Sequence, residues 1–189
     1  MIGSHGLVQM QQLQLTPGNK LLRAMWQVIW LLLYRPSPIP LHAWRRVLLR
    51  LFGATIEANA RAYPSTKIWA PWNLTMRQNS CMGPYVDCYC VDKIELGVGA
   101  TISQYSYLCS ASHDYMKRQH PLITAPIHVH DHAWVAADVF VGPGVTIGEG
   151  AVVFARSTVV RDIEAWMVVA GPDAKVKKRR ELKDGSDSF

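Results

Sequence analysis

The sequence predicts a mainly β protein: a parallel β-helix of triangular cross-section, preceded by two short helices. The first observation is an aliphatic residue at every sixth position, namely Val129, Val135, Val141, Ile147, Val153 and Val159. The second is a small or β-branched residue four places after each of the first five, namely Ala133, Val139, Val145, Ala151 and Ser157. A period of six fits neither an α-helix nor a flat alternating strand. We therefore interpret it as a solenoid repeat.

The six-residue unit has a simple physical interpretation. Each unit forms one short strand and one turn, and three units complete one coil. The aliphatic side chain points inward and stacks on the coils before and after it, while the small residue lies near a corner. Glycine, Asn or Asp supplies the unusual turn dihedrals. Because each coil contacts only its neighbours, stability is roughly a sum over coils.

The N-terminal region has a different pattern. Residues 1–18 are rich in Gln, and we expect them to be poorly ordered or tied to a neighbouring subunit. Asn19 is expected to cap a helix from Lys20 to about Tyr34. One face of that helix carries Leu22, Trp26, Ile29, Trp30 and Leu33. Residues 35–40 are rich in Pro and predict a stiff extended linker. A second helix is predicted at about 41–51, ending near Gly53.

The coils are predicted to begin at about residue 54. Inward positions are expected at Ile56, Ala62, Ile68, Met76, Met82 and Cys88, and after a gain of two residues at Leu96, Ile102 and Leu108. Residues 109–126 lack the repeat and predict a loop that leaves one corner, where function is often carried. The expected organisation is therefore a tail and helices at 1–53, the β-helix at 54–174, and a basic C-terminal segment at 175–189.

The net charge of +6 is concentrated in the N-terminal region. Residues 1–56 contain six basic residues and no acidic one, namely Lys20, Arg23, Arg35, Arg45, Arg46 and Arg50. The apolar run at 24–34 is well short of the roughly 20 residues that span a bilayer. It predicts either a helix packed on protein or an interfacial helix at an anionic membrane. The repeat region has no basic stripe with interleaved aromatic residues, which argues against nucleic acid as a partner.

The four cysteines do not form a recognisable metal or redox motif. Cys81, Cys88, Cys90 and Cys109 lack zinc-finger spacing and contain no CxxC pair. We expect buried, unpaired thiols in a reducing compartment. No signal peptide is apparent. The expected localisation is cytoplasmic, or peripheral at the inner face of the membrane.

Residues 54–180 resemble the hexapeptide-repeat acyltransferases. The segment from Ile102 to Tyr115, Ile-Ser-Gln-Tyr-Ser-Tyr-Leu-Cys-Ser-Ala-Ser-His-Asp-Tyr, is very similar to the colanic-acid (exopolysaccharide) acetyltransferase branch. The resemblance implies a left-handed parallel β-helix, a homotrimer with active sites between subunits, and acetyl-CoA as acyl donor. It also implies that no metal is needed.

His113 is the predicted catalytic residue. In similar enzymes a loop histidine removes the proton from the acceptor hydroxyl, and His113 lies in the predicted loop. Histidine suits this role because its pKa is close to working pH. Four polar residues are expected to bind the acceptor: Asp87, Tyr89, Asp92 and Asp114.

The same resemblance implies a groove for acetyl-CoA between neighbouring subunits. The matching positions are Trp134, Ala137, Gly142, Ala155, Val160, Arg161, Lys175 and Lys178. The basic members would contact phosphate. The sequence departs from the family where Arg77 replaces a common glycine, where Phe154 and Arg156 flank Ala155, and in the order of residues 170–175. These departures bear on the local geometry of the groove.

The leading functional prediction is an acetyl-CoA-dependent O-acetyltransferase that modifies a sugar or glycolipid acceptor in exopolysaccharide or lipopolysaccharide biosynthesis. One alternative is another acceptor, such as an amino sugar, serine or an antibiotic. A second is a non-catalytic β-helix scaffold. A third is a zinc site at His128, His130 and His132, as in the γ-class carbonic anhydrases. Those enzymes include two ligands five residues apart, and no two histidines here have that spacing.

Overall fold

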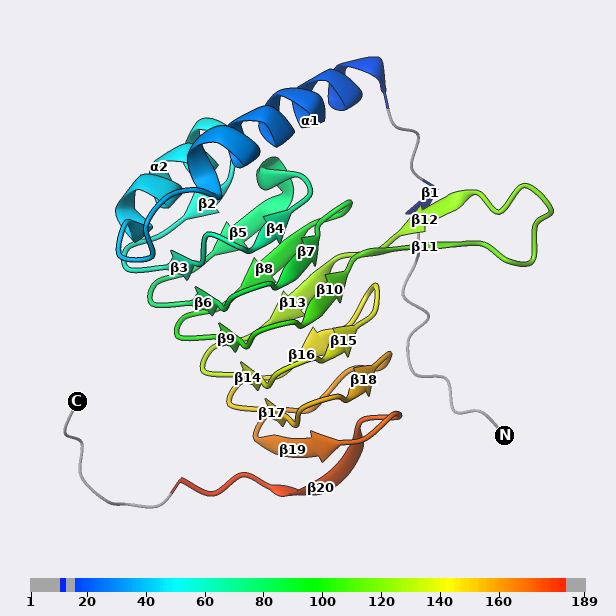
Figure 1. Ribbon diagram of the computed structural model, residues 1–189. Helices are drawn as coiled ribbons and strands as arrows, with labels where there is room; N and C mark the ends of the chain where they lie inside the picture. The colour runs from blue at the N-terminus through cyan, green and yellow to red at the C-terminus, as the bar shows by residue number, and fades with distance from the viewer. Residues whose placement is uncertain (1–10, 13–15, 183–189) are drawn as a thin grey trace.

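The computed structural model describes residues 11–12 and 16–182. The chain forms a triangular solenoid of parallel strands with two helices across its N-terminal end (Figure 1). Sheet I contains β2 (Thr55–Ile56), β5 (Leu74–Met76), β8 (Ile94–Leu96), β13 (Ile127–Val129) and β16 (Thr146–Ile147). Sheet II contains β3 (Arg61–Ala62), β6 (Cys81–Met82), β9 (Thr101–Ile102), β14 (Trp134–Val135), β17 (Val152–Val153), β19 (Met167–Ala170) and β20 (Lys175–Arg179). Sheet III contains β4 (Lys67–Ile68), β7 (Asp87–Tyr89), β10 (Tyr107–Cys109), β15 (Phe140–Val141) and β18 (Thr158–Val159).

The interior of the solenoid confirms the six-residue frame. The predicted inward residues are at most 5% exposed, from Ile56 in the first coil to Val159 in the fifth. The small corner residues are also buried, and Ala133, Val145 and Ser157 are each 1% exposed. Adjacent coils pair in parallel register, as where Val135 lies between Ile102 and Val153. The core is therefore a set of stacked aliphatic columns.

The N-terminal helices begin and end close to the predicted positions. Helix α1 (Pro17–Ile29) continues as the π-helical segment η1 (Trp30–Tyr34), and α2 (His42–Leu51) follows. The predicted cap was wrong: Thr16, rather than Asn19, caps α1, and its Oγ1 accepts a hydrogen bond from the Asn19 N–H at 3.3 Å. Pro17 follows the cap because a proline at the first helical position loses no helical hydrogen bond.

Hydrogen bonds between coils run from the N–H of one coil to the carbonyl of the next, as from Glu57 to Met76 at 2.8 Å. The first coil therefore presents carbonyls that no preceding coil can satisfy. Helix side chains donate to them: Trp26 to Ile68, Trp30 to Thr66, Arg45 to Ala62, Arg46 to Ala60 and Arg50 to Ile56. Three of the six basic residues that suggested a membrane or acidic partner thus cap the first coil.

Arg45 is the most buried of these donors, at 1% exposed. Besides Ala62, it donates to the carbonyls of Pro38 and Ile39 at 2.8 and 2.5 Å. The linker at 35–40 consequently folds into turns around the guanidinium, whereas the proline content predicted an extended chain. The position of both helices over the solenoid is therefore held by side-chain donors as well as by apolar contact.

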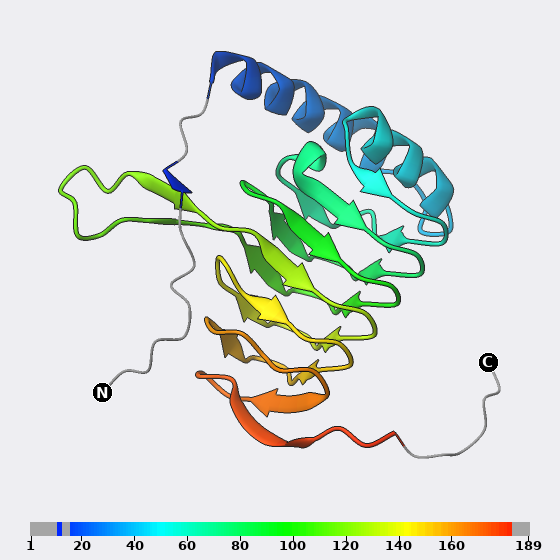
Figure 2. The same ribbon diagram turned by 180° about the vertical axis from the view of Figure 1, so that it is seen from behind.

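The irregular segments all follow a strand of sheet III and precede one of sheet I, at what we call the III–I corner. The first is a short 3₁₀ turn, η2 (Pro71–Asn73), and the second comprises residues 90–93. The third contains an antiparallel hairpin, β11 (Ala111–His113) and β12 (Leu122–Thr124), where a loop was predicted. Figures 1 and 2 show the hairpin projecting from the solenoid. The turn η2 lengthens the step from Ile68 to Met76 to eight residues, and Met76 is inward as predicted.

Strand β1 (Gln11–Gln12) pairs antiparallel with β12 of the same chain. This differs from the expectation that the region is poorly ordered or tied to another subunit. Residues 1–10, 13–15 and 183–189 lie outside the described residues. The four cysteines are unpaired, as predicted. Within the described residues, no helix is both long and apolar enough to span a membrane.

Candidate active site

His113 is the last residue of β11 and pairs with Leu122, at the outer end of the paired part of the hairpin. Its side chain is exposed, and its Nδ1 is 2.6 Å from the backbone carbonyl oxygen of His120. A carbonyl only accepts hydrogen bonds, so Nδ1 carries the proton in the neutral ring. Nε2 then has a free lone pair and can accept a proton. His120 has a positive φ of 41°, which shows that the hairpin tip adopts an uncommon backbone conformation to place this carbonyl.

Two predicted acceptor-binding carboxylates make local contacts. Asp114 accepts a hydrogen bond from the Met116 N–H at 3.1 Å, and its other oxygen is 3.3 Å from Lys117 Nζ. Asp92 accepts from the Lys93 N–H at 2.7 Å. These contacts brace the hairpin and the III–I corner. An acceptor-binding role for either residue stays a prediction.

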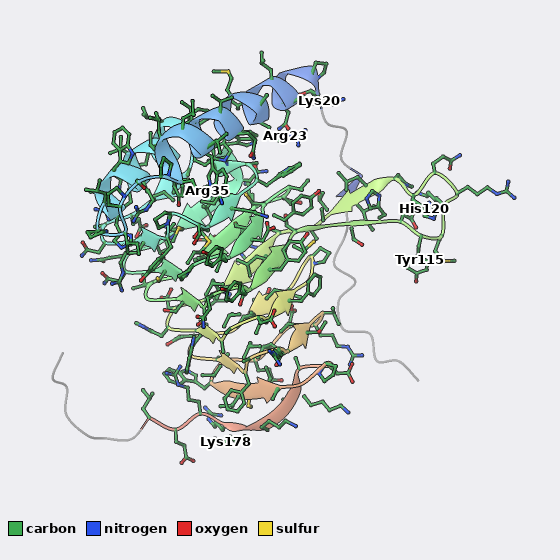
Figure 3. The ribbon with its side chains drawn as sticks, viewed as in Figure 1. Lys20, Arg23, Arg35, Tyr115, His120 and Lys178 are labelled. Atoms are coloured by element: carbon green, nitrogen blue, oxygen red, sulfur yellow. The ribbon has the colours of Figure 1, made fainter. Side chains whose placement is uncertain are left out.

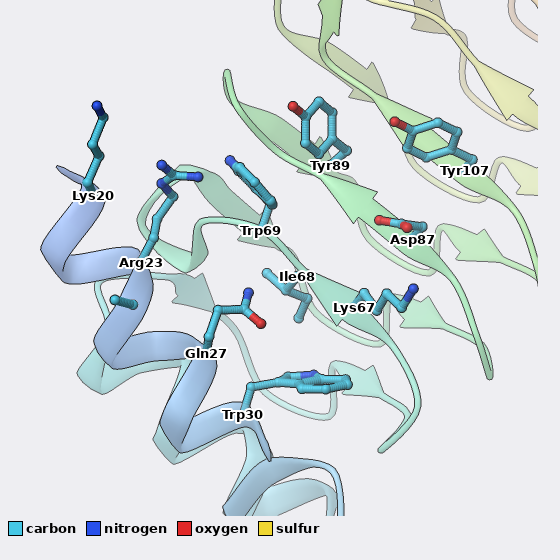
Figure 4. Close-up of a pocket in the computed structure, with 11 residues that line it drawn as sticks. Lys20, Arg23, Gln27, Trp30, Lys67, Ile68, Trp69, Asp87, Tyr89 and Tyr107 are labelled. Carbon is cyan, nitrogen blue, oxygen red and sulfur yellow. The ribbon is translucent and has the colours of Figure 1, made fainter. Parts of the chain in front are cut away.

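The other two, Asp87 and Tyr89, line a cleft of about 680 Å³ between α1 and sheet III. Lys20, Arg23, Ala24, Gln27 and Trp30 form the helix side, and Lys67, Ile68, Trp69, Asp87, Tyr89 and Tyr107 form the sheet side. Figure 4 shows Arg23, Gln27 and Trp30 directed toward the sheet, with Asp87 and the two tyrosines on the facing side, and Lys20 extending from the start of the helix. A cleft of this size is typical of small-molecule sites.

Sequence reasoning missed Lys20, Arg23, Trp69 and Tyr107. The sheet residues could have been found from the repeat, because Lys67, Asp87 and Tyr107 are spaced by 20 and pair in register. Trp69 and Tyr89 share the same spacing, and their rings lie 5.0 Å apart. The helix residues could not, because the sequence does not show how α1 crosses the sheet.

The cleft has a distinct electrostatic character. Burial raises the pKa of the Asp87 carboxyl, and the charge of Lys67 partly opposes that rise. Burial also raises the pKa of Tyr89 and Tyr107, so both phenols stay protonated at neutral pH and can donate hydrogen bonds. On the opposite wall the Arg23 guanidinium lies 4.5 Å from the centroid of the Trp69 ring. The cleft thus combines cations, aromatic faces and neutral hydroxyl donors.

The predicted cofactor residues divide between separate parts of the chain. Trp134 lies on β14, with its indole N–H donating to Ser103 Oγ at 3.0 Å. Ala137 and Ala155 lie at the corner between sheets II and III, whereas Gly142, Val160 and Arg161 lie at the III–I corner and Lys175 and Lys178 on β20. A second cavity of about 440 Å³ includes Arg161 and Lys175. Of the eight residues, these two alone line it.

Arg77, which departs from the family pattern, has an identifiable role. Its guanidinium pairs with Glu57 at 3.0 Å and with Glu95 at 2.9 Å across three coils. Hydrogen bonding from Arg77 lowers the pKa of Glu57. Arg77 therefore belongs to a surface ion network on sheet I and its corner.

The histidine triplet does not form a metal site. His128 lies on β13 with Nδ1 3.8 Å from Glu95, while His130 and His132 occupy the turn that follows. The described part of the chain contains no group of three or more His, Cys, Asp or Glu side chains arranged to hold a metal ion.

Comparison with known proteins places the chain among acetyltransferases. No family model matches it. Escherichia coli (strain K12) WcaF, named as a colanic acid biosynthesis acetyltransferase, is 41% identical over 163 residues, which cover 86% of this chain and 90% of WcaF. The E. coli galactoside O-acetyltransferase is 27% identical over 146 residues, covering 74% of this chain and 70% of that enzyme.

Solved structures show the same fold. The hexapeptide-repeat acetyltransferase VCA0836 of Vibrio cholerae, complexed with acetyl-CoA, has a TM-score of 0.78 at 25% identity, covering 88% of this chain and 91% of that one. A maltose O-acetyltransferase from Clostridium difficile 630 has a TM-score of 0.76 at 23% identity, covering 87% and 91%.

The triangular coils and these similarities define a hexapeptide-repeat acetyltransferase with a left-handed parallel β-helix, and the chain belongs to that family. Within the family, the similarity to WcaF extends over most of both chains. The predicted resemblance to the colanic-acid branch is therefore confirmed.

Proposed function

We propose that the protein transfers acetyl from acetyl-CoA to a sugar hydroxyl in exopolysaccharide or lipopolysaccharide assembly. The family relationship supports acetyl transfer, and the V. cholerae neighbour was solved with acetyl-CoA. The observation that carries the proposal is the fixed tautomer of His113, which leaves Nε2 able to accept a proton. A scaffold protein would not need that arrangement on a projecting hairpin.

The proposed reaction is direct transfer. Nε2 of His113 takes the proton from the acceptor hydroxyl as its oxygen attacks the thioester carbonyl carbon. The carbon–sulfur bond then breaks, and the imidazolium returns the proton to the CoA thiolate. The His120 carbonyl, which accepts from Nδ1–H, stabilises the transient imidazolium. Holding thioester and hydroxyl side by side supplies much of the rate.

We also propose that the acetyl-CoA site is completed by a second copy of the chain. The eight predicted residues lie on β14, on two corners and on β20, so a single coil cannot present them all to one ligand. In a homotrimer, the II–III corner of one subunit would face the III–I corner and β20 of the next. Measuring the mass of the protein in solution tests this arrangement.

We further propose that α1 contacts an anionic membrane surface. Helix α1 and η1 expose seven large apolar side chains: Leu21, Leu22, Met25, Val28, Leu31, Leu32 and Leu33. Figure 3 shows Arg35, a basic residue directly after η1 that belongs neither to the cap of the first coil nor to the lining of the cleft. Cosedimentation with phosphatidylglycerol vesicles, but not with phosphatidylcholine vesicles, is the expected result. Equal binding to both, or to neither, would contradict the contact.

The catalytic proposal is tested by comparing wild type with His113→Ala. A ligand at about 100 times its Kd stabilises a protein by roughly 2.7 kcal/mol, so acetyl-CoA should raise the Tm of both proteins equally. Acetyl transfer, measured as CoA release with a panel of sugars, should fall about 10²–10⁴-fold in the variant. His130→Ala, an exposed histidine on another corner, is the matched control and should transfer at the wild-type rate.

The measurement of acetyl-CoA binding and the measurement of acetyl transfer test different parts of the proposal. If acetyl-CoA shifts neither protein, the acyltransferase proposal fails at its cofactor. If both bind it and His113→Ala still transfers acetyl normally, the cofactor assignment stands and the base is a different residue. A preference for an amino sugar, serine or an antibiotic in the panel would replace the sugar hydroxyl as acceptor.

A further inference from the structure

The cleft between α1 and sheet III carries more positive charge than its own residues balance. Lys20 and Arg23 contribute two cations from α1 and Lys67 a third from β4, whereas Asp87 is the one acidic residue of the lining. Residues 16–182 provide no ion-pair partner for Lys20, Arg23 or Lys67. A ligand with about two negative charges would complement this surplus.

Arg23 is the side chain that points most clearly to a ligand. Its Nε is buried and has no hydrogen-bond partner in the described part of the chain. A buried donor without a partner costs free energy. A small movement of the Arg23 side chain toward an acceptor bound in the cleft would relieve that cost. The contact with the Trp69 ring holds the guanidinium at the sheet wall of the cleft, where its terminal nitrogens can donate to a phosphate oxygen.

Lys20 lies one turn before Arg23 on the same helical face, so both cations can contact one anionic group. Both residues line the cleft, and Figure 4 shows them one turn apart at the start of the helix. Residues 1–56 contain no acidic residue that would pair with Lys20 or Arg23 in place of a ligand. The helix wall therefore has the chemistry of a phosphate or diphosphate site.

The sheet wall has the chemistry of a sugar site. Trp69, Tyr89 and Tyr107 form a row of rings, with centroids 5.0 and 6.3 Å apart along the row. Aromatic faces pack against apolar C–H surfaces, and the neutral phenols and the Asp87 carboxyl offer hydrogen bonds to hydroxyls. The two walls together fit a molecule with a sugar at one end and phosphate at the other.

We infer that this cleft binds a glycosyl phosphate or diphosphate, with the sugar on the aromatic wall and the phosphate on Lys20 and Arg23. The inference rests on the proposed function, because it specifies the acceptor class for acetyl transfer. A nucleotide-linked sugar and a lipid-linked sugar share this chemistry. A free monosaccharide would leave the cations of the helix wall without a partner.

Binding is tested by calorimetry with the full chain, with saturating acetyl-CoA present so that the cofactor's phosphate sites are filled. The probes are inorganic pyrophosphate, UDP-glucose, glucose and glucuronate. Wild type should bind pyrophosphate and UDP-glucose at least tenfold more tightly than glucose or glucuronate. The double variant Lys20→Gln with Arg23→Gln should weaken pyrophosphate and UDP-glucose at least tenfold. Arg61→Gln with Lys93→Gln, exposed cations outside the cleft, should change them less than twofold.

A second arm distinguishes the two sources of the ligand. Phosphatidylcholine vesicles that contain a polyprenyl-diphosphate-linked glucose are compared with UDP-glucose in solution. Tighter binding to either one supports the inference and identifies the source. The inference is overturned if pyrophosphate and both glycosyl diphosphates bind no better than glucose, or if the double variant binds them like wild type.

The acetyl-CoA control separates this inference from the proposed function. Both double variants should retain the wild-type Tm shift with acetyl-CoA, because neither changes a predicted cofactor residue. If acetyl-CoA fails to bind wild type while pyrophosphate still binds through Lys20 and Arg23, the cleft inference survives and the catalytic proposal fails. If acetyl-CoA binds normally and neither pyrophosphate nor the glycosyl diphosphates bind, the cleft inference fails and the catalytic proposal is unaffected.

Discussion

Two corners of the triangular solenoid are built in opposite ways. The corner between sheets I and II has a turn of the same length in every coil, and its coils stack closely. A Cβ added at Gly148 would clash with the Ala165 backbone and lie 2.8 Å from Ala165 Cα. The III–I corner instead accommodates η2, residues 90–93 and the hairpin. A stack of coils therefore tolerates added chain at one corner while it excludes a single methyl group at another.

The added segments at the III–I corner are held by side chains. Asn73 Nδ2 donates to the carbonyls of Cys90 and Val91 at 3.1 and 2.8 Å. Ser110 Oγ lies between Tyr89 O and the backbone of Asp92, at 2.9 Å from the Asp92 N–H. Each insertion is thus bonded to the one in the neighbouring coil. The III–I corner ends up ordered, and it places the hairpin that carries His113 as well as the row of rings in the cleft.

Glycine-to-alanine substitutions should give the largest contrast between the corners. Gly148→Ala should destabilise by about 2–3 kcal/mol, because the methyl group meets backbone that cannot move without separating two coils. Gly142→Ala, at the III–I corner, should change stability by less than about 0.5 kcal/mol, since its nearest neighbours are 3.5 Å away. Urea unfolding of the two variants measures the difference. Equal effects would show that the corners are equally tight.

Serine-to-alanine substitutions should give a smaller difference in the free energy of unfolding, and here the III–I corner should lose more stability than the I–II corner. Ser110→Ala removes a hydroxyl that accepts from the Asp92 N–H and donates to the carbonyls of Tyr89 and Asp92, and should cost about 1–3 kcal/mol. Ser80→Ala, at the I–II corner, removes one 2.7 Å hydrogen bond to Arg77 O and should cost about 1 kcal/mol or less. The same unfolding assay compares them. A larger loss for Ser80→Ala would mean that the insertions are held by something other than Ser110.

The smallest expected effect tests the capped end of the solenoid by pH. Burial and the adjacent Arg45 charge lower the pKa of His42, whose Nδ1 lies 2.9 Å from Arg45 Nη2. The native state therefore favours neutral His42. The stability that neutral His42 contributes is complete above the pKa of an unfolded histidine, about 6.5. That stability is lost as the pH falls from this value toward the lowered pKa of His42 in the native state. Urea unfolding between about pH 5 and 8 should show a shallower acid-side decline in His42→Gln than in wild type. Parallel curves would contradict this assignment.

The repeat predicted the coils because each inward position is decided locally, by one aliphatic residue in six. It also marked residues 109–126, which contain His113, as the segment that departs from the coils. The cleft itself was not predictable, because its second wall depends on how α1 crosses sheet III. That crossing is set by contacts such as Trp26 with Ile68, which are 42 residues apart in sequence. The roles of Asp92, Asp114 and the cofactor residues stay predictions.

The side-chain donors over the first coil also decide how long the solenoid can grow. A parallel coil with open carbonyls is a template to which another chain could add its own coil, and repetition would give a fibre. The tryptophans and arginines of the helices occupy those carbonyls, while β20 pairs antiparallel with β19 at the far end. The parallel template is thus capped at its N-terminal end and interrupted on sheet II at the other end, which favours association through the sides of the solenoid.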